Sequence, residues 1–317
     1  MTGGRIDVVA VAPAEAAAAV SPRPSSSARG SGGFSLLVLP ALIMFLAFAF
    51  IPMIGVLVLS FTSWDGISPI TFTGLASWRE MLTDPGLYHS LAVTFAVMIC
   101  SWLVQTPISL LLGTFVAGRQ RYRALLAVLY FLPLLMSSAA VAIAFKSLLD
   151  PYFGLGAGLH LEFLSQDWLG DPQLAFGVVI FVIAWQFVPF HTLIYQGGVR
   201  QIPGQLYEAA QIDGAGRVRQ FFSITIPQLK YTIITSSTLI LVGSLTYFDL
   251  IFVLTGGGPG NATRILALDM YIRGFQANQM GAASVIGVFL VALGLMLTLG
   301  IQRLGGRDRS ASQMEGM

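Results

Sequence analysis

Six long apolar stretches dominate this sequence and determine the solvent in which it must fold. A helix needs roughly 20 apolar residues to cross the hydrocarbon core of a bilayer. Such stretches lie at 34–62, 88–117, 124–148, 174–199, 229–254 and 280–302. The chain is 55% hydrophobic and 10% charged, too little polar surface to cover a water-soluble globule of 317 residues. The sequence therefore predicts an all-α membrane protein with about six transmembrane helices.

The ends of the chain differ from this apolar domain, which we expect at 34–302. Residues 1–33 are rich in Ala, Ser, Pro and Gly and have no apolar periodicity, which predicts a disordered tail. The apolar stretch that follows is too long for a signal peptide, so we expect a retained span. Residues 303–317 are predicted to form a second tail.

Positive residues are distributed unevenly among the loops, and such residues favour the cytoplasmic side of a membrane. With the N-terminus inside, the cytoplasmic loops contain Arg119, Arg121, Arg123, Arg200, Arg217, Arg219 and Lys230. The external loops then contain most of the acidic residues, including Asp65, Asp84, Asp150, Glu162, Asp167 and Asp171. Both termini are therefore predicted to be cytoplasmic.

The loop after the fourth stretch, residues 200–228, is long for a turn between neighbouring spans. Its segment Gln205–Ile212 is compatible with a helix, which Gly214 and Gly216 are expected to stop. A second short helix is expected over 217–223, ending before Pro227.

The surface of this loop suits close approach by another protein. Ala209 and Ala210 add little bulk, while Glu208 and Asp213 offer carboxylates to a basic partner. Taken alone, these features are equally compatible with a solvated loop between helices.

Two motifs connect the chain to a known family. Glu208-Ala209-Ala210, Asp213-Gly214-Ala215 and the closing Ile224-Thr225-Ile226-Pro227 resemble the EAA loop of permease subunits in type I ABC importers. The stretch 248–259, FDLIFVLTGGGP, is similar to a signature of the maltose and glycerol-phosphate branch.

This resemblance implies a type I permease bundle in the bacterial inner membrane that forms half of the path for a sugar or similar solute. The residues around 208–216 would form a coupling helix, with Glu208, Ala209, Ala210, Asp213, Gly214 and Ala215 contacting an ATPase. The implied partners are a second, related permease, two ATP-binding subunits and an external substrate-binding protein. ATP and magnesium would be bound by the ATP-binding subunits.

Features of other protein classes are missing from the sequence. Gly256–Gly258 is not followed by the Gly-Lys-Ser/Thr of a phosphate-binding loop, so hydrolysis must come from another chain. His89, His160 and His191 are far apart, and Cys100 is the single cysteine, so no metal cluster is expected. The near-balanced charge gives no reason to expect nucleic acid. We expect no cofactor in this chain, and a transporter subunit rather than an enzyme.

A substrate path should show polar and aromatic groups within the spans. The fourth stretch offers Trp185 and Gln186, and the fifth offers Ser237, Ser244 and Tyr247 near one stripe. Asp249 follows toward the end of the fifth stretch, where a carboxylate needs water or a partner. Each of these six residues is also compatible with plain helix packing.

Two other classes share this composition. A secondary transporter driven by an ion gradient would be expected to show an inverted repeat or more carboxylates within its spans. A membrane receptor or scaffold subunit would use the 200–228 loop as a general docking site. Co-purification of an ATPase distinguishes the importer from both.

Overall fold

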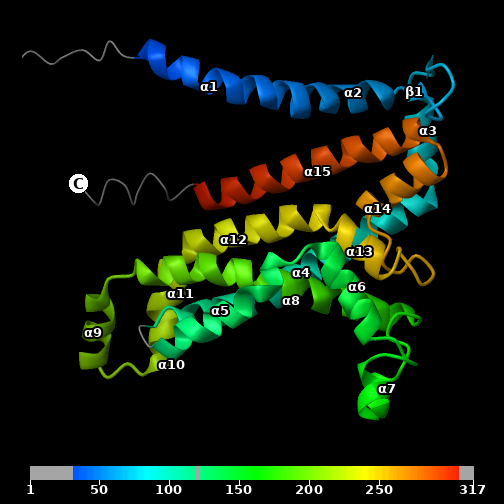
Figure 1. Cartoon of the computed structure of the whole chain (residues 1–317). Coiled ribbons are helices and arrows are strands. Elements are labelled where there is room, and N and C mark those ends of the chain that lie inside the picture. Colours follow the sequence, from blue (N-terminus) through cyan, green and yellow to red (C-terminus); the bar gives the residue numbers. More distant parts are fainter. Residues whose placement is uncertain (1–30, 119–120, 307–317) are drawn as a thin grey trace, which may run out of the picture. The chain divides into compact units, whose positions relative to one another are not determined.

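The structure is a computed structural model that describes residues 31–118 and 121–306, and it is mostly helical (Figure 1). The chain divides into two units, residues 1–51 and 52–317, and the elements from β1 onward all belong to the second. The predicted tails at 1–33 and 303–317 lie outside the described residues, except for 31–33 and 303–306, which are helical.

The elements include short 3₁₀ or π turns, labelled η. In chain order they are α1 (Ser31–Phe45), η1 (Leu46–Phe50), α2 (Ile51–Leu59), β1 (Thr62–Ser63), β2 (Thr71–Phe72), α3 (Ala76–Thr83), α4 (Pro85–Val116), α5 (Arg121–Leu135), α6 (Ser138–Leu148), α7 (Leu155–Leu159), η2 (Glu162–Leu164), α8 (Pro172–Arg200), α9 (Gly204–Ile212), α10 (Arg217–Gln220), η3 (Phe221–Thr225), α11 (Ile226–Gln228), α12 (Lys230–Gly243), η4 (Ser244–Thr246), α13 (Phe248–Leu254), α14 (Leu266–Tyr271), η5 (Ile272–Gln276) and α15 (Met280–Gly306).

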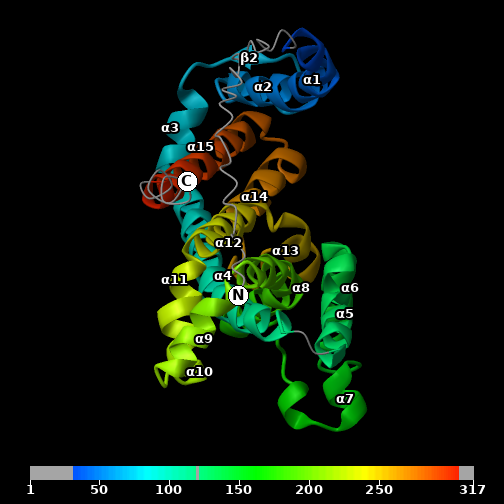
Figure 2. The same cartoon turned by 90° about the vertical axis from the view of Figure 1, so that its left-hand side faces the viewer.

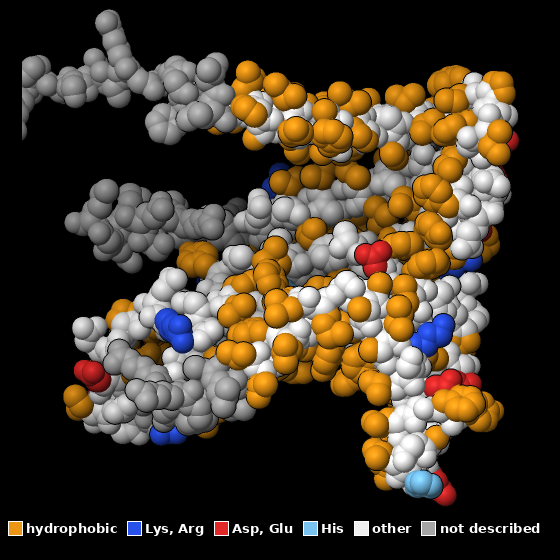
Figure 3. All heavy atoms as spheres, in the orientation of Figure 1, with side chains coloured by type: hydrophobic (Ala, Val, Ile, Leu, Met, Phe, Trp, Pro, Cys, Tyr) orange, Lys and Arg blue, Asp and Glu red, His pale blue; other side chains and the backbone are white. Residues whose placement is uncertain are grey.

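Within the described residues, four helices are long and apolar enough to cross a membrane, and two bent helix pairs raise the number to as many as six. The four are Val38–Leu59, Pro85–Val116, Pro172–Arg200 and Met280–Arg303. Hydrophobic side chains cover much of the face seen in Figure 3. Exposed apolar surface of this extent agrees with the predicted bilayer environment.

The third predicted span, 124–148, is not one straight helix. It bends by 103° between α5 and α6. Pro133 lies near the end of α5, and the Ser137 hydroxyl accepts a hydrogen bond of 3.2 Å from the amide of Ala140 and so caps α6. A proline followed by an N-cap serine starts a new helix instead of continuing the old one.

The fifth predicted span, 229–254, is also interrupted. A bend of 71° between Arg217–Gln228 and Lys230–Thr246 lies at the predicted start of this span. Within the span, α12 gives way to the 3₁₀ turn η4 before α13 begins. The backbone of Tyr247 leaves the helical region at φ −73° and ψ 33°. The expected continuous span is therefore three short pieces.

The core of the second unit lies where α4, α8, α13 and α14 meet (Figures 1 and 2). It contains valines and isoleucines of α8, such as Val179 and Ile183, with Leu250 of α13 and Leu268 of α14, none more than 1% exposed. α8 is therefore the central helix of this unit, in contact with α4, α5, α6, α12 and α13.

The crossing of α4 and α8 is unusually close. A Cβ atom built on Gly113 of α4 would lie 2.6 Å from the Cβ of Tyr195 and 3.1 Å from the carbonyl oxygen of Thr192, both on α8. Small residues at membrane helix crossings allow such approach.

Candidate functional site

The predicted coupling segment forms the short helix α9, which ends in a glycine cap. Gly214 has φ +74°. The amide of Gly214 donates to the carbonyl of Gln211 at 3.0 Å, and the amide of Ala215 donates to the carbonyl of Ala210 at 2.8 Å. This is the Schellman arrangement, which satisfies the last helical carbonyls and favours glycine at the left-handed position. The prediction that Gly214 stops this helix is confirmed, whereas Gly216 instead precedes α10 as its N-cap.

The surface of this segment is largely uncovered within the second unit. Glu208, Ala209, Asp213 and Gly214 are exposed, while Ala210 and Ala215 are half-buried. Large apolar side chains are exposed beside them: Ile212 is 88% exposed and Val218 73%. An exposed apolar surface next to carboxylates is typical of a protein-docking site.

The second helix of the loop is longer than predicted. Instead of stopping before Pro227, the chain continues from α10 through the π turn η3 into α11, which ends at Gln228. Pro227 lies inside this continuous helical segment, just after the π turn η3, where a proline removes one backbone hydrogen bond of the helix. The Tyr207 and Thr225 hydroxyls, 2.9 Å apart, link α9 to this helix.

A cavity of about 310 Å³ lies between α5, α6, α8, α12 and α13. Of the predicted path residues, Tyr247 and Asp249 line it. Phe187, Phe190 and His191 of α8 line it as well and were absent from the prediction. Their i, i+3 and i+4 spacing places them on one helical face, a signal that the sequence contains.

Polar and aromatic groups are held firmly in the cavity wall. The Nδ1 atom of His191 lies 3.0 Å from the hydroxyl oxygen of Ser236. The Tyr247 ring stacks on that of Phe187, with centroids 5.2 Å apart. Asp249 is exposed at the start of α13. The cavity thus combines aromatic faces, an imidazole and a carboxylate.

Three other predicted path residues do not line this cavity. Gln186 is buried and donates from Nε2 to the carbonyl of Met136 at 3.2 Å, at the α5–α6 bend. The Ser237 hydroxyl accepts a hydrogen bond of 2.8 Å from the indole of Trp102. The Ser244 hydroxyl donates to the carbonyl of Leu241 at 2.7 Å. The stripe expected along the fifth span is broken because the helix ends before Ser244.

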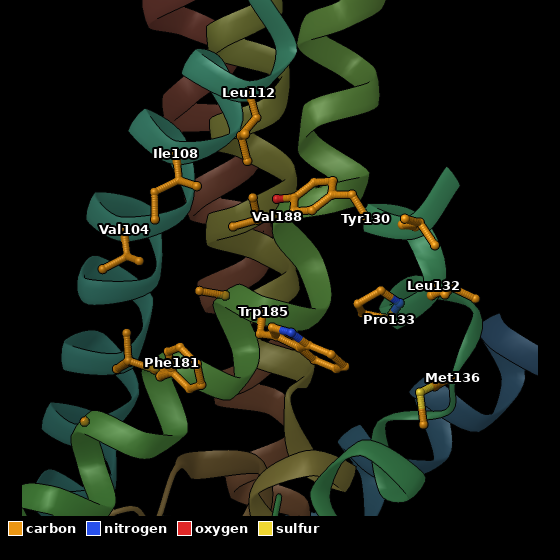
Figure 4. A pocket seen from close by; sticks show the side chains of 14 residues that line it. Val104, Ile108, Leu112, Tyr130, Leu132, Pro133, Met136, Phe181, Trp185 and Val188 are labelled. Carbon is orange, nitrogen blue, oxygen red and sulfur yellow. The ribbon is translucent and has the colours of Figure 1, made fainter. Parts of the chain in front are cut away.

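Trp185 lies on another side of α8, in a groove of about 750 Å³ between α4, α5 and α8 (Figure 4). Its ring meets that of Phe145 edge-on, with centroids 5.1 Å apart. The lining is apolar apart from the Tyr130 hydroxyl and the Trp185 indole nitrogen. Trp185 and Gln186 are adjacent in sequence but occupy different environments.

The glycine-rich stretch after α13 is an ordered turn. The Thr263 hydroxyl donates to the carbonyl of Gly258 at 3.0 Å and lies 2.7 Å from the hydroxyl of Thr255. Among the described residues, no group of three His, Cys, Asp or Glu side chains could hold a metal ion.

The sequence matches the family model of the binding-protein-dependent transport system inner membrane component over residues 105–309, more than half of the chain. The chain belongs to this family. Its members are permease subunits and not enzymes. Family membership, together with the apolar helices, makes the chain a multi-pass membrane protein, and it favours the importer over the ion-driven and scaffold alternatives.

Curated relatives extend over most of the permease. A probable ABC transporter permease, YurN of Bacillus subtilis, is 34% identical over 83% of this chain and 92% of its own length. MsmF, a permease of the multiple sugar-binding transport system of Streptococcus mutans, is 32% identical over 85% of this chain and 94% of its own length.

The permease also has solved structural neighbours. A bacterial ABC transporter involved in the import of the acidic polysaccharide alginate contains a chain that matches with a TM-score of 0.77. The match is 23% identical and covers 87% of this chain and 96% of that one. This likeness confirms the ABC permease fold.

Proposed function

We propose that this chain is one permease subunit of an ATP-driven importer and forms half of the path for a sugar or sugar-like solute. The observation that carries the proposal is family membership combined with relatives named as sugar permeases, such as MsmF. The partners proposed are a second, related permease, two ATP-binding subunits and an external substrate-binding protein. The complex would lie in a bacterial inner membrane with both termini of this chain in the cytoplasm, as the arginine distribution favours.

Energy would enter through α9. The exposed face of α9 and the glycine cap after it, with Glu208, Ala209 and Gly214 uncovered, are suited to a groove of an ATP-binding subunit. Closure of the ATPase dimer would pull this helix and rock the spans between inward-facing and outward-facing states. The bends at α5–α6 and before α12 are places where a bundle can change its shape.

Substrate would pass the cavity lined by Phe187, His191, Tyr247 and Asp249. Aromatic faces suit the apolar face of a sugar ring, and an imidazole and a carboxylate suit its hydroxyl groups. Of the six residues predicted from sequence, Tyr247 and Asp249 are therefore the strongest candidates for contact.

The test is uptake into proteoliposomes that contain the complete complex. We expect accumulation of a labelled sugar only with ATP on the ATPase side and binding protein on the other. Uptake driven by an ion gradient without ATP would contradict the importer.

Asp249→Asn should raise the substrate concentration needed for half-maximal uptake, because a charged hydrogen-bond acceptor is lost. Such bonds contribute about 1.5–3 kcal/mol, equivalent to roughly 10–100-fold in affinity. Uptake kinetics in proteoliposomes measure the effect, and complex assembly should be normal. Ser165→Ala, in the connection between η2 and α8, is the control and should leave uptake unchanged. Unaltered uptake kinetics in Asp249→Asn would show that this carboxylate does not contact the substrate.

A further inference from the structure

Four charged side chains form a partly buried network where α4 begins. Arg264 donates to Oδ1 of Asp269 from Nε at 2.9 Å and from Nη2 at 2.6 Å. Arg273 donates from Nε to Oδ2 of Asp269 at 3.1 Å and from Nη2 to Oδ2 of Asp84. Asp269 is only 1% exposed, and both of its carboxylate oxygens are occupied. Arg273 is thus shared between two carboxylates.

The network joins segments that are far apart in sequence. Asp84 precedes α4 and caps it, because its Oδ1 accepts the amide of Gly86 at 2.8 Å. The other three residues belong to the connection between α13 and α15, 255–279. Arg273 and Asp84 are 189 residues apart.

Two further hydrogen bonds tie the same segments together. The Thr94 hydroxyl of α4 accepts the amide of Leu266 at 2.8 Å. The Nε2 atom of His89 lies 3.0 Å from the carbonyl oxygen of Asn261. The first turns of α4 are therefore attached to residues 255–276 at three levels, at Asp84, at His89 and at Thr94.

The charges balance within the network. The backbone amide of Gly86 and, less strongly, the Arg273 guanidinium hold the pKa of Asp84 below its usual value, while partial burial opposes this. Partial burial works against the charge of Arg273, but Asp269 and Asp84 together raise its pKa above its usual value. Removing one member leaves a partner charge without compensation, which is costly in a poorly solvated site.

We infer that the first turns of α4 and residues 255–276 move as one rigid body during transport, with Arg273 as the positioning residue that holds them together. This inference rests on the proposed function. Residues 255–276 continue directly from α13, which carries Asp249 beside the cavity. The α13 wall of the cavity therefore moves with α4, and the change of shape occurs elsewhere in the bundle.

The test uses two spin labels in the assembled complex, with Cys100 replaced by Ala. One label replaces Tyr88 of α4 and the other replaces Gln276 of η5, both exposed side chains. Double electron–electron resonance should give one narrow distance that is the same without nucleotide and with ATP trapped by vanadate. Arg273→Gln should broaden that distance distribution. Arg79→Gln, an exposed arginine of α3, is the matched control and should leave it narrow.

A wild-type distance that shifts with the nucleotide state would overturn the inference, as would an Arg273→Gln distribution as narrow as that of the wild type. If the Arg273→Gln complex does not assemble, Asp84→Asn is labelled instead, because this change leaves both arginines paired with Asp269. Its distance distribution should be broader than that of the wild type, and an equally narrow one would overturn the inference. Absence of ATP-driven uptake by the unlabelled wild-type complex would instead contradict the proposed function. Failure of the inference and failure of the proposed function are therefore distinguishable. In uptake assays, Arg273→Gln should lower the solute carried per ATP, because the α13 wall of the cavity no longer moves together with α4.

Discussion

Gly214→Asp should abolish ATP-driven uptake while the chain still inserts in the membrane. A Cβ at this position meets no atom within 4 Å, so the isolated chain has room for it, although φ +74° adds strain. The harm is expected at the ATPase, where a charge would be desolvated without a partner at a cost of a few kcal/mol. We expect capture of the ATPase by the purified permease to fall roughly 10–100-fold.

The matched control is Gly74→Asp, at a glycine between β2 and α3 that also has a positive φ, +59°, and open space around it but lies far from the loop in sequence. It should leave both ATPase capture and uptake unchanged. Pull-down and uptake are measured for the two variants side by side. Normal assembly and uptake in Gly214→Asp would show that α9 is not the coupling element.

Gly113→Leu should prevent α4 and α8 from packing. The new Cβ alone would lie 2.6 Å from that of Tyr195, and its nearest neighbours include backbone atoms of Gln196 and Thr192, which cannot rotate away. Overpacking of a tight core typically costs about 1–3 kcal/mol, and here two helices must separate. We expect a large fall in the yield of monodisperse protein and in its thermal midpoint, measured by fluorescence-detected size-exclusion chromatography in detergent.

Gly197→Leu provides the comparison on α8, the other helix of this crossing. A Cβ at this glycine of α8 has no neighbour within 4 Å. Its thermal midpoint should stay close to that of the wild type. Equal midpoints for Gly113→Leu and Gly197→Leu would show that the α4–α8 contact does not determine stability.

The long apolar stretches were predictable because roughly 20 apolar residues have few alternatives to a span. The places where spans break were harder to predict. Pro133 and Ser137 carry a local signal for the α5–α6 bend, since one disrupts a helix and the other caps the next. The break at Tyr247 has no such signal. Its ring is stacked on Phe187 of another helix, so tertiary packing accompanies the break.

The candidate site, like the fold, could be predicted from the sequence only in part. Gly214 was predictable as a helix stop because a left-handed position favours glycine. Ser237 and Trp185 were assigned to the path by residue type, but their neighbours Trp102 and Phe145 lie on other helices and could not be deduced from spacing. The pairing of Arg273 with Asp84 joins residues 189 positions apart and follows only from the fold.

The central claim, that this permease is driven by a separate ATPase, is tested most directly by ATP hydrolysis. The purified chain alone should hydrolyse no ATP. The complex with its ATP-binding subunits should hydrolyse ATP, and faster when binding protein loaded with substrate is added. Hydrolysis by the isolated chain, or a complex whose rate is indifferent to loaded binding protein, would contradict the account.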